Sequence, residues 1–389
     1  MGDSLAAQLR RYQFYKQGLI ERIYRDFYEV ADAAIGLHST DYWTPYLSAW
    51  ARIGDYDAKQ VFDSLNAGKT VVRRRAFRNT LHVVHIDNYG LILGGLGPQL
   101  ERSMRLAPPI KDLTDSEVED RIVEIQQSLQ DGPLSMNDMK KKLPHIGEQL
   151  RWLFLIANAR GLIVRTEGSH ARSTRLDYDL ASRWLGDYNL PKIGEETAIS
   201  ELIFKYIDHF GPVTINDLAW WIPLKVTETK EFLQKLGTRI SEIKVDDKNH
   251  IITSDDLEKA KSLEIPEEST VSLLPYEDHF PKAFKERSWY ITSEIEKMLF
   301  PRNREHFWPP KMNPPPPGPP KGMNASGEIR PSIWIDGKIV GRWEVETDED
   351  QANVQYAIVA KVAKSLQDEV AQECEDLSEF INKRLLPIS

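Results

Sequence analysis

The feature that most constrains the fold of this chain is a short internal repeat. The segment GPLSMNDM at residues 132–139 returns 79 residues later as GPVTINDL at 211–218, with the same or similar residues at six positions. Gly-Pro makes a turn, and Ser135 or Thr214 can then cap a helix that carries an aspartate three residues after the cap. More helix and then a β-like segment follow each copy. We therefore predict two copies of one helix-turn-helix unit that ends in a strand pair, with chance similarity of two short segments as the alternative.

The N-terminal part has the same order of elements. Residues 5–34 carry apolar residues at helical spacing, and TPYLSAWARI and DAKQVFDSLNAG predict two further short helices. KTVVRRRAFRNTLHVVHI then turns β-like, and ARGLIVRTEGSHARSTRLDYDL later in the chain predicts a strand, a polar turn and a strand. Helices followed by a strand pair are typical of a winged helix, so we predict three tandem winged-helix (helix-turn-helix) domains. Their predicted ranges are 1–105 with the N-terminal helices, 106–195 and 196–256.

The sequence pattern changes after residue 256. VSLLPYEDHF and RPSIWIDGKIVGRWEVE are β-like, and Asp336-Gly337 between alternating apolar residues predicts a hairpin. Eight prolines lie from Pro309 to Pro320, and such a segment cannot form a helix or a central strand. We expect a stiff surface loop there, with a ligand for a proline-recognition domain as the alternative. The segment NVQYAIVAKVAKSLQDEVAQECEDLSEFINKRL at 353–385 predicts a final amphipathic helix.

The composition limits the class of protein. No apolar run in the 389 residues approaches the length of roughly 18 that spans a bilayer, and the N-terminus lacks the apolar core of a signal peptide, so we expect a cytoplasmic protein. The single cysteine, Cys374, excludes an internal disulfide and a multi-cysteine zinc site. The net charge of −9 counts against a dedicated nucleic-acid binder. However, residues 69–105 hold seven basic and two acidic residues, whereas eleven acids and four bases follow from Glu344 onward, so a basic working face can coexist with an acidic tail.

The sequence contains no motif for a metal or a cofactor. The nine histidines show no metal-ligand arrangement, since His82 and His85 are three apart in a predicted strand and face opposite sides. The chain has no GxxxxGK(S/T) loop, no Rossmann-type GxGxxG and no GxSxG nucleophile elbow. We therefore expect no cofactor, no metal and none of the nucleotide-dependent or hydrolase classes that these motifs mark.

The basic run VVRRRAFRNT is more informative. In a strand, Arg73 and Arg75 share one face and Arg74 lies on the other. The planar guanidinium group of arginine can donate two hydrogen bonds to one phosphate, and nearby aromatic side chains could stack on a base. Those aromatic residues are Trp43, Trp50 and Phe77. A solvated or ion-paired edge strand explains the run equally well.

Two stretches carry a family resemblance. GLHSTDYWTPYLSAWARI followed by VVRRRAFRNTLHVV resembles the N-terminal unit of the winged-helix DNA glycosylases, the AlkZ-like and YcaQ-like group of azinomycin-resistance type. That family has a Pro-x-Leu-x-x-Trp-x-Arg helix and an Arg-x-Thr-Leu-His strand. The matching residues here are Pro45, Leu47, Trp50, Arg52, Arg78, Thr80, Leu81 and His82. GPVTINDLAWWI, LLPYEDHF and RPSIWIDGKIVGRW are similar to later family segments, so the resemblance covers nearly the whole chain.

The resemblance implies an α+β fold in which three winged helices precede a C-terminal β-barrel-like domain. That last domain would be residues 257–389, with the Pro-rich loop and the acidic C-terminal helix. In the family, the C-shaped scaffold cradles duplex DNA and excises alkylated purines, including N7-linked crosslinks in some members.

The family's catalytic signature, Gln-x-Gln or Gln-x-Asp, falls on His38 and Thr40, and Asp41 follows directly. A cationic N7-alkylpurine leaves readily, so the enzyme mainly has to place a water and stabilise an oxocarbenium-like sugar. Histidine can hold water and accept a proton, whereas threonine offers a hydrogen bond without charge. We predict that His38, with Thr40 or Asp41, is catalytic. The alternatives are a decayed site, a His38 that bonds the backbone at a helix end, and an Asp41 that caps the helix near Trp43.

The leading hypothesis is a monomeric, monofunctional DNA glycosylase that hydrolyses the N-glycosidic bond of alkylated purines such as N7-alkylguanine in duplex DNA. Charge placement and the resemblance predict DNA contacts at Arg73, Arg74, Arg75, Arg78, Arg160, Arg165, Arg330 and Lys338. The main alternative is a DNA-binding protein without catalysis, such as a regulator or a damage sensor, because tandem winged helices support it equally. A protein-interaction scaffold is the third possibility, and the net charge is its best argument.

Overall fold

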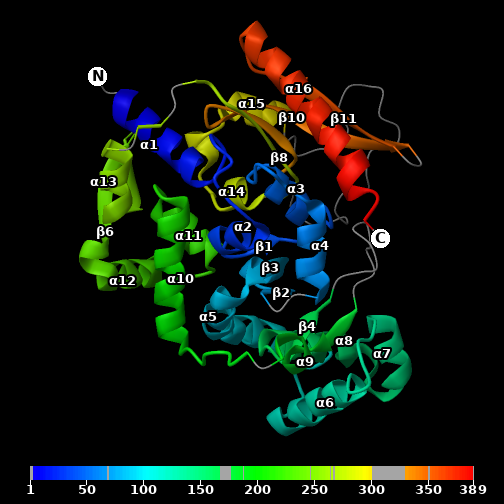
Figure 1. Ribbon diagram of the computed structural model, residues 1–389. Helices are drawn as coiled ribbons and strands as arrows, with labels where there is room; N and C mark the ends of the chain where they lie inside the picture. Colours follow the sequence, from blue (N-terminus) through cyan, green and yellow to red (C-terminus); the bar gives the residue numbers. More distant parts are fainter. Residues whose placement is uncertain are drawn as a thin grey trace.

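The computed structural model describes residues 3–67, 70–166, 177–186, 188–245, 247–262, 264–265, 268–299, 329–348 and 351–388. These ranges contain helices and three antiparallel sheets (Figure 1), a mixture that agrees with the predicted α+β class. The same ranges contain no helix that is both long and apolar enough to cross a membrane. The predicted proline-rich loop lies outside the described residues.

The N-terminal part does not form the single long helix that its apolar spacing predicted. α1 (Asp3–Lys16) ends before Gly18, whose φ of +68° is left-handed. Asp26 accepts a hydrogen bond from the Glu29 amide and starts a separate helix, α2 (Phe27–Ala33), so a cap inside the periodic stretch divides it. The elements that follow are β1 (Leu37–His38), α3 (Thr44–Trp50), α4 (Ala58–Ala67), β2 (Val71–Arg75), the 3-10 helix η1 (Phe77–Asn79) and β3 (Leu81–His85).

The middle part begins with a long helix and ends in a strand pair. Its elements are α5 (Ile86–Arg105), α6 (Asp115–Ser128), α7 (Met136–Lys142), η2 (Pro144–Gln149), α8 (Leu150–Ala159), β4 (Ile163–Arg165), β5 (Tyr178–Leu180) and α9 (Ala181–Leu185). β4 and β5 pair antiparallel and confirm the predicted strands, while the turn between them, 167–176, lies outside the described residues. Ser135 caps α7 by accepting from the Asp138 amide at 3.1 Å, as the repeat predicted.

The second copy of the repeat begins a similar series. Its elements are α10 (Glu195–Phe210), α11 (Ile215–Trp221), α12 (Val226–Leu236), η3 (Gly237–Arg239), β6 (Ile240–Val245), β7 (Lys248–Thr253) and α13 (Ser254–Ser262). Thr214 caps α11 by accepting from the Asp217 amide at 3.2 Å, and the Asp217 carboxylate accepts from the Thr214 amide at 2.9 Å. The two copies of the repeat therefore make the same kind of helix start.

A five-stranded sheet joins the first two parts of the chain. Its strand order is β1-β3-β2-β4-β5, and β2 meets β4 where Arg73 lies opposite Arg165. The strand pairs predicted for two separate domains thus form one hydrogen-bonded ladder. The strand pair of the third part, β6 and β7, stays a sheet of its own among the described residues.

The C-terminal part contains a four-stranded sheet of order β11-β10-β9-β8. Its elements are β8 (Val271–Leu274), α14 (His279–Lys282), η4 (Arg287–Trp289), α15 (Ser293–Leu299), β9 (Ser332–Ile335), β10 (Lys338–Asp348), β11 (Gln351–Ile358), α16 (Lys364–Phe380) and the π-helical turn Ile381–Leu385. The predicted hairpin is present, with Asp336 and Gly337 at positive φ between β9 and β10.

Two predictions for this part are corrected. The first residues of the predicted final helix form β11, because Val354 and its neighbours pair with β10, so the helix begins only at Lys364. In the described residues β8 and β11 are the two edges of an open sheet, so the predicted barrel is not confirmed.

A buried ion pair ties the C-terminal part to the N-terminal part. The Arg52 guanidinium donates to both carboxylate oxygens of Asp278 at 2.9 and 2.8 Å, and Ser48 donates to the same carboxylate at 2.7 Å. Both charged side chains are 0% exposed. Figure 1 shows α3 and α14, the helices next to this pair, near the centre of the molecule. The pair fixes the segment before α14 against β1 and α3, where the candidate site lies.

Candidate active site

The candidate site forms around His38, the last residue of β1. His38 lies opposite His82 of β3 in the sheet register, and the two rings meet edge-on with centroids 5.4 Å apart. The preceding Gly36 has no room for a side chain, because a Cβ there would lie 2.7 Å from the ring of Phe77. The strand therefore enters the site tightly packed, and only 4% of His38 is exposed.

Two side chains face the same nitrogen of His38. Nε2 lies 3.4 Å from Thr40 Oγ1 and 3.5 Å from Glu277 Oε2. Thr40 is exposed, whereas Glu277 is buried, so the imidazole lies between the surface and an interior carboxylate. The sequence prediction included His38 and Thr40 but missed Glu277. Its only signal in the sequence is its place directly before Asp278 in LLPYEDHF.

Glu277 is held in an unusual backbone conformation. Its φ is +54°, a left-handed value that costs energy for a residue other than glycine and is often found at functional sites. The Ile329 amide donates to its Oε1 at 2.7 Å, and its own amide donates to the Ile329 carbonyl at 2.9 Å. Lys282 forms an ion pair with Oε2. These contacts fix the carboxylate beside the imidazole.

Cationic side chains surround the carboxylate. Arg78 lies on η1 with a φ of +50°, and its guanidinium carbon is 3.6 Å from the ring centroid of Trp220 on α11. Burial, partly opposed by the charge of Glu277, lowers the pKa of Arg78 to about 10, and Arg287 contributes in the same direction as burial. Of the residues predicted to contact DNA, Arg78 is the one that lies beside the catalytic candidates.

The electrostatic surroundings keep His38 neutral. Burial is the main cause that lowers the pKa of His38 to about 3, and the positive charges of Lys282 and Arg78 act in the same direction. The imidazole is therefore uncharged at neutral pH and can accept a proton or a hydrogen bond. Its Nδ1 is buried and has no hydrogen-bond partner among the described residues.

Asp41 binds the backbone just before α3. Its Oδ1 accepts hydrogen bonds from the amides of Trp43 at 2.9 Å and Thr44 at 3.2 Å, although Trp43 and not Asp41 is the N-cap of the helix. Burial raises the pKa of this carboxyl, and the two backbone bonds oppose that effect. The anion next to His38 is the carboxylate of Glu277.

Several predicted DNA contacts are buried or paired. Arg73 and Arg74 are 3% and 0% exposed, and Arg74 donates to the carbonyls of Arg75 and Ala159. Neither side chain is exposed at the surface, where a phosphate would bind. The aromatic side chains predicted to stack on a base, Trp43, Trp50 and Phe77, are buried as well.

Arg160 is held by two carboxylates. It donates to Glu101 at 2.9 and 2.6 Å and to Glu119 at 2.6 Å, and the bonds to Glu101 are the first cause of its raised pKa. These two carboxylates already balance the charge of Arg160, and the phosphate contact predicted for it stays a prediction.

The remaining predicted contacts are half-buried or exposed. Arg75 and Arg165 lie on the neighbouring strands β2 and β4, and Arg165 lies 5.2 Å from the ring centroid of Tyr178. Arg330 is half-buried just before β9, and Lys338 is exposed at the start of β10. Arg75, Arg165 and Lys338 therefore stay candidates for phosphate contacts, together with Arg330.

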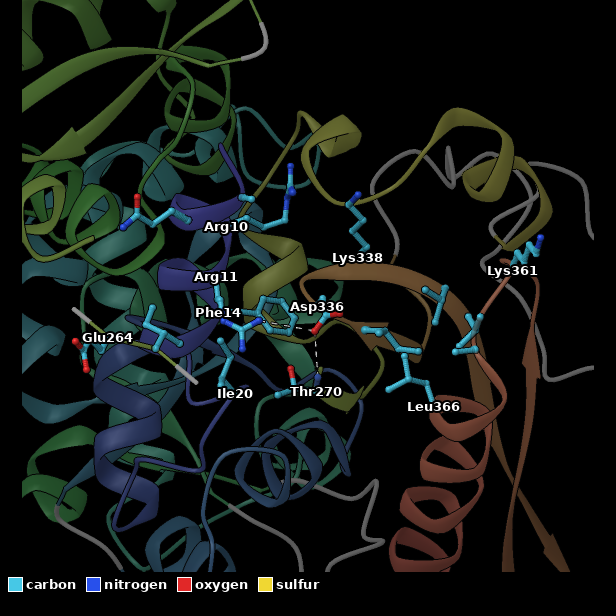
Figure 2. A pocket seen from close by; sticks show the side chains of 17 residues that line it. Arg10, Arg11, Phe14, Ile20, Glu264, Thr270, Asp336, Lys338, Lys361 and Leu366 are labelled. Carbon is cyan, nitrogen blue, oxygen red and sulfur yellow. Dashed lines mark hydrogen bonds and ion pairs between the residues drawn. The ribbon is translucent and has the colours of Figure 1, made fainter. Parts of the chain in front are cut away.

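Lys338 also lines a cavity of about 1080 Å³. The cavity lies between α1, the β9–β10 hairpin and the start of α16, and Figure 2 shows Asp336 at the hairpin facing Arg11. Its lining includes neither His38 nor Glu277, so it is separate from the candidate active site. The described residues also contain no cluster of three or more His, Cys, Asp or Glu side chains that could hold a metal ion.

Comparison with known proteins connects this geometry to one family. The sequence model described as "DNA glycosylase AlkZ-like" matches residues 31–380. This chain belongs to the AlkZ-like DNA glycosylase family. The family resemblance noted in the sequence is thus confirmed. The members of this family are DNA glycosylases, so membership in it implies that DNA is the substrate of this chain.

A solved structure supports the AlkZ-like fold. The chain is similar to the DNA glycosylase AlkZ of Streptomyces sahachiroi, with a TM-score of 0.73 and 16% sequence identity over 98% of this chain and 97% of that one. At this identity the likeness shows the fold alone. No curated protein matches the chain in sequence.

Proposed function

We propose that this AlkZ-like chain hydrolyses the N-glycosidic bond of alkylated purines such as N7-alkylguanine in duplex DNA, with water as the nucleophile. The observation that carries the proposal is the position of His38 Nε2, 3.4 Å from Thr40 Oγ1 and 3.5 Å from Glu277 Oε2. A neutral acceptor, a hydroxyl and an anion thus meet at one point. These are the groups that a water-dependent cleavage of this bond needs.

His38 and Thr40 position the water in this mechanism. They stand where the family resemblance places Gln-x-Gln or Gln-x-Asp. With its proton on Nδ1, the neutral imidazole offers the Nε2 lone pair to a water that Thr40 also bonds. As the water attacks C1′, Nε2 accepts a hydrogen bond from it and keeps its lone pair directed at that carbon. An imidazole with a pKa of about 3 is a weak base, so the attacking water then loses its proton to solvent. The exposed Thr40 marks the side from which the DNA reaches the site.

Glu277 supplies the negative charge that was first assigned to Asp41. The sugar becomes positively charged as the purine leaves, and a fixed carboxylate stabilises that charge without having to reorganise. The bond from the Ile329 amide and the ion pair with Lys282 hold the carboxylate in place. Asp41 instead holds the start of α3, so its role is to position the helix that follows the site.

The interpretation as three winged helices is part of this proposal. Helices followed by an antiparallel strand pair recur at α2–β3, α6–β5 and α10–β7. These units would correspond to the domains 1–105, 106–195 and 196–256, with 257–389 as the fourth. Arg75, Arg165, Arg330 and Lys338 are our remaining proposed contacts to the DNA backbone.

Base release tests the proposal. Duplex DNA that carries N7-methylguanine is incubated with wild type, His38→Ala and Glu277→Gln, and abasic sites are counted after alkali treatment. We expect release by wild type and a loss of about 100-fold or more in each variant. His145→Ala is the matched control, because His145 is a half-exposed histidine that pairs with Glu124 on α6.

The outcomes separate the candidate functions. Wild type that binds the duplex but releases no base would support the non-catalytic DNA-binding alternative. Full activity of His38→Ala would move the catalytic site elsewhere. A duplex with an N7-linked interstrand crosslink is the second substrate, because hydrolysis of the same bond at the linked purine would unhook it.

A further inference from the structure

The candidate site contains a lysine that the proposed hydrolysis uses only to hold Glu277 in place. Lys282 is the last residue of α14, and its side chain is 14% exposed. Its Nζ forms an ion pair with the same Glu277 oxygen, Oε2, that lies 3.5 Å from His38 Nε2. The Lys282 amine and the His38 imidazole, which is proposed to place the water, therefore face the same carboxylate oxygen of Glu277.

We propose that Lys282 gives this site a second activity, in which its amine attacks the abasic sugar left by base removal and the DNA strand is cut by β-elimination. The position of that sugar beside Lys282 rests on the proposed function. The activity goes beyond it, because a monofunctional glycosylase stops at the abasic site.

The surroundings of Lys282 suit a nucleophilic amine. Burial is the first cause that lowers its pKa, and the charges of Arg78 and Arg287 add to the effect, while Glu277 opposes it. A desolvated lysine next to other cations is a recurring way to activate an amine, because the neutral form becomes more accessible.

The chemistry balances with the groups at hand. The abasic sugar opens to an aldehyde at C1′, and Lys282 Nζ forms a bond to that carbon while the aldehyde oxygen leaves as water. The Glu277 carboxylate or the neutral His38 then takes a proton from C2′. The C3′–O bond breaks, and the phosphate leaves with the electron pair. Water finally hydrolyses the imine and restores the lysine amine, so the reaction needs no oxidant and no cofactor.

Borohydride trapping on preformed abasic DNA tests the inference. A duplex with one abasic site is incubated with the full-length chain and sodium borohydride, which reduces the imine to a stable protein–DNA adduct. Lys282→Arg keeps the positive charge beside Glu277 but cannot form the imine. Lys285→Arg is the matched control, because Lys285 is exposed three residues further along and any adduct at surface lysines would involve it equally.

We expect an adduct with wild type and with Lys285→Arg, and at least about a tenfold loss with Lys282→Arg. No adduct with wild type, or an undiminished adduct with Lys282→Arg, would overturn the proposal. The thermal unfolding midpoint of Lys282→Arg is measured in parallel, and peptide mass spectrometry of the wild-type adduct identifies the modified lysine if that variant does not fold.

The experiment also separates this inference from the proposed function. Base release from N7-methylguanine DNA is measured on the same wild-type preparation. Release without an adduct on abasic DNA refutes the lyase activity and leaves the glycosylase proposal in place. An adduct through Lys282 without base release supports the lyase activity and refutes the glycosylase proposal.

Discussion

The ion pair between Arg52 and Asp278 offers a quantitative test of how the fold holds its site. Both side chains are fully buried. Asp278 accepts two hydrogen bonds from Arg52, one from Ser48 and one from the Phe280 amide. Asp278→Asn keeps the volume of the side chain but removes its charge, so the Arg52 guanidinium stays buried without a counter-ion. Breaking one partner of a buried pair in this way costs about 3–5 kcal/mol.

The pKa of Asp278 leads to a similar magnitude. Burial is the largest single cause and raises the pKa, but the charges of Arg52 and His279 and the hydrogen bonds from Arg52 and Ser48 together outweigh it. The pKa falls to about 2, from an ordinary 3.8. A difference of nearly two units corresponds to about 2 kcal/mol. Because the folded pKa is the lower one, this stabilisation is complete above the unfolded value and is lost as pH falls through about 2. We therefore expect Asp278→Asn to lose about 2–5 kcal/mol at neutral pH.

Urea unfolding at neutral pH measures this loss. Asp63→Asn is the control, because Asp63 and its partner Lys59 are both more than half exposed and their pair should contribute less than about 0.5 kcal/mol. Adding Arg52→Met to Asp278→Asn should recover part of the loss, since the uncompensated charge is then gone. An Asp278→Asn chain that unfolds within about 1 kcal/mol of wild type would refute the argument.

The remaining predictions distinguish buried groups from surface groups. Burial lowers the pKa of His38 to about 3, so the imidazole stays neutral above that pH and its protonation should not lower the rate of base release between about pH 8 and 5. A fall in that rate with a midpoint near pH 6.5, absent in His38→Gln, would contradict this. Trp220→Ala removes the ring whose centroid lies 3.6 Å from the Arg78 guanidinium carbon, and should lower the free energy of unfolding by about 1 kcal/mol. Thermal unfolding measures this loss, and an unchanged midpoint would show that the stacking does not stabilise the fold. Arg165→Gln should reduce the slope of log Kd for DNA against log salt concentration by about 1, whereas the buried Arg74→Gln should destabilise the fold and leave that slope unchanged. A slope that changes with Arg74→Gln and not with Arg165→Gln would mean that Arg74 contacts the DNA.

Local signals in the sequence predicted local structure well. The caps at Ser135 and Thr214 depend on residues within three positions of each other, so the repeat alone was sufficient. The Asp336-Gly337 hairpin depends on two left-handed residues that the dipeptide favours. The early part of the predicted final helix was wrong because its partner strand, β10, was needed to show that those residues pair in a sheet.

The site depended on contacts that no local pattern contains. His38 and Thr40 followed from the family resemblance, but Glu277 reaches them from the far part of the chain through the Arg52–Asp278 pair. The strand β2 was predicted correctly, yet the sequence could not show that Arg73 and Arg74 are both buried in it. Distant charge partners were missed for the same reason, because pairing depends on tertiary structure.

The five-stranded sheet makes the first two parts of the chain one structural unit. β2 pairs with β3 on one side and with β4 on the other, and the rung from Arg73 to Arg165 crosses the boundary predicted between these units. A gene rearrangement that moved the first unit alone would leave one edge of β2 with unpaired backbone groups, which favours aggregation. Recombination within this family should therefore exchange the two units together. A rearrangement that separated them would have to supply another strand to pair with the exposed edge of β2.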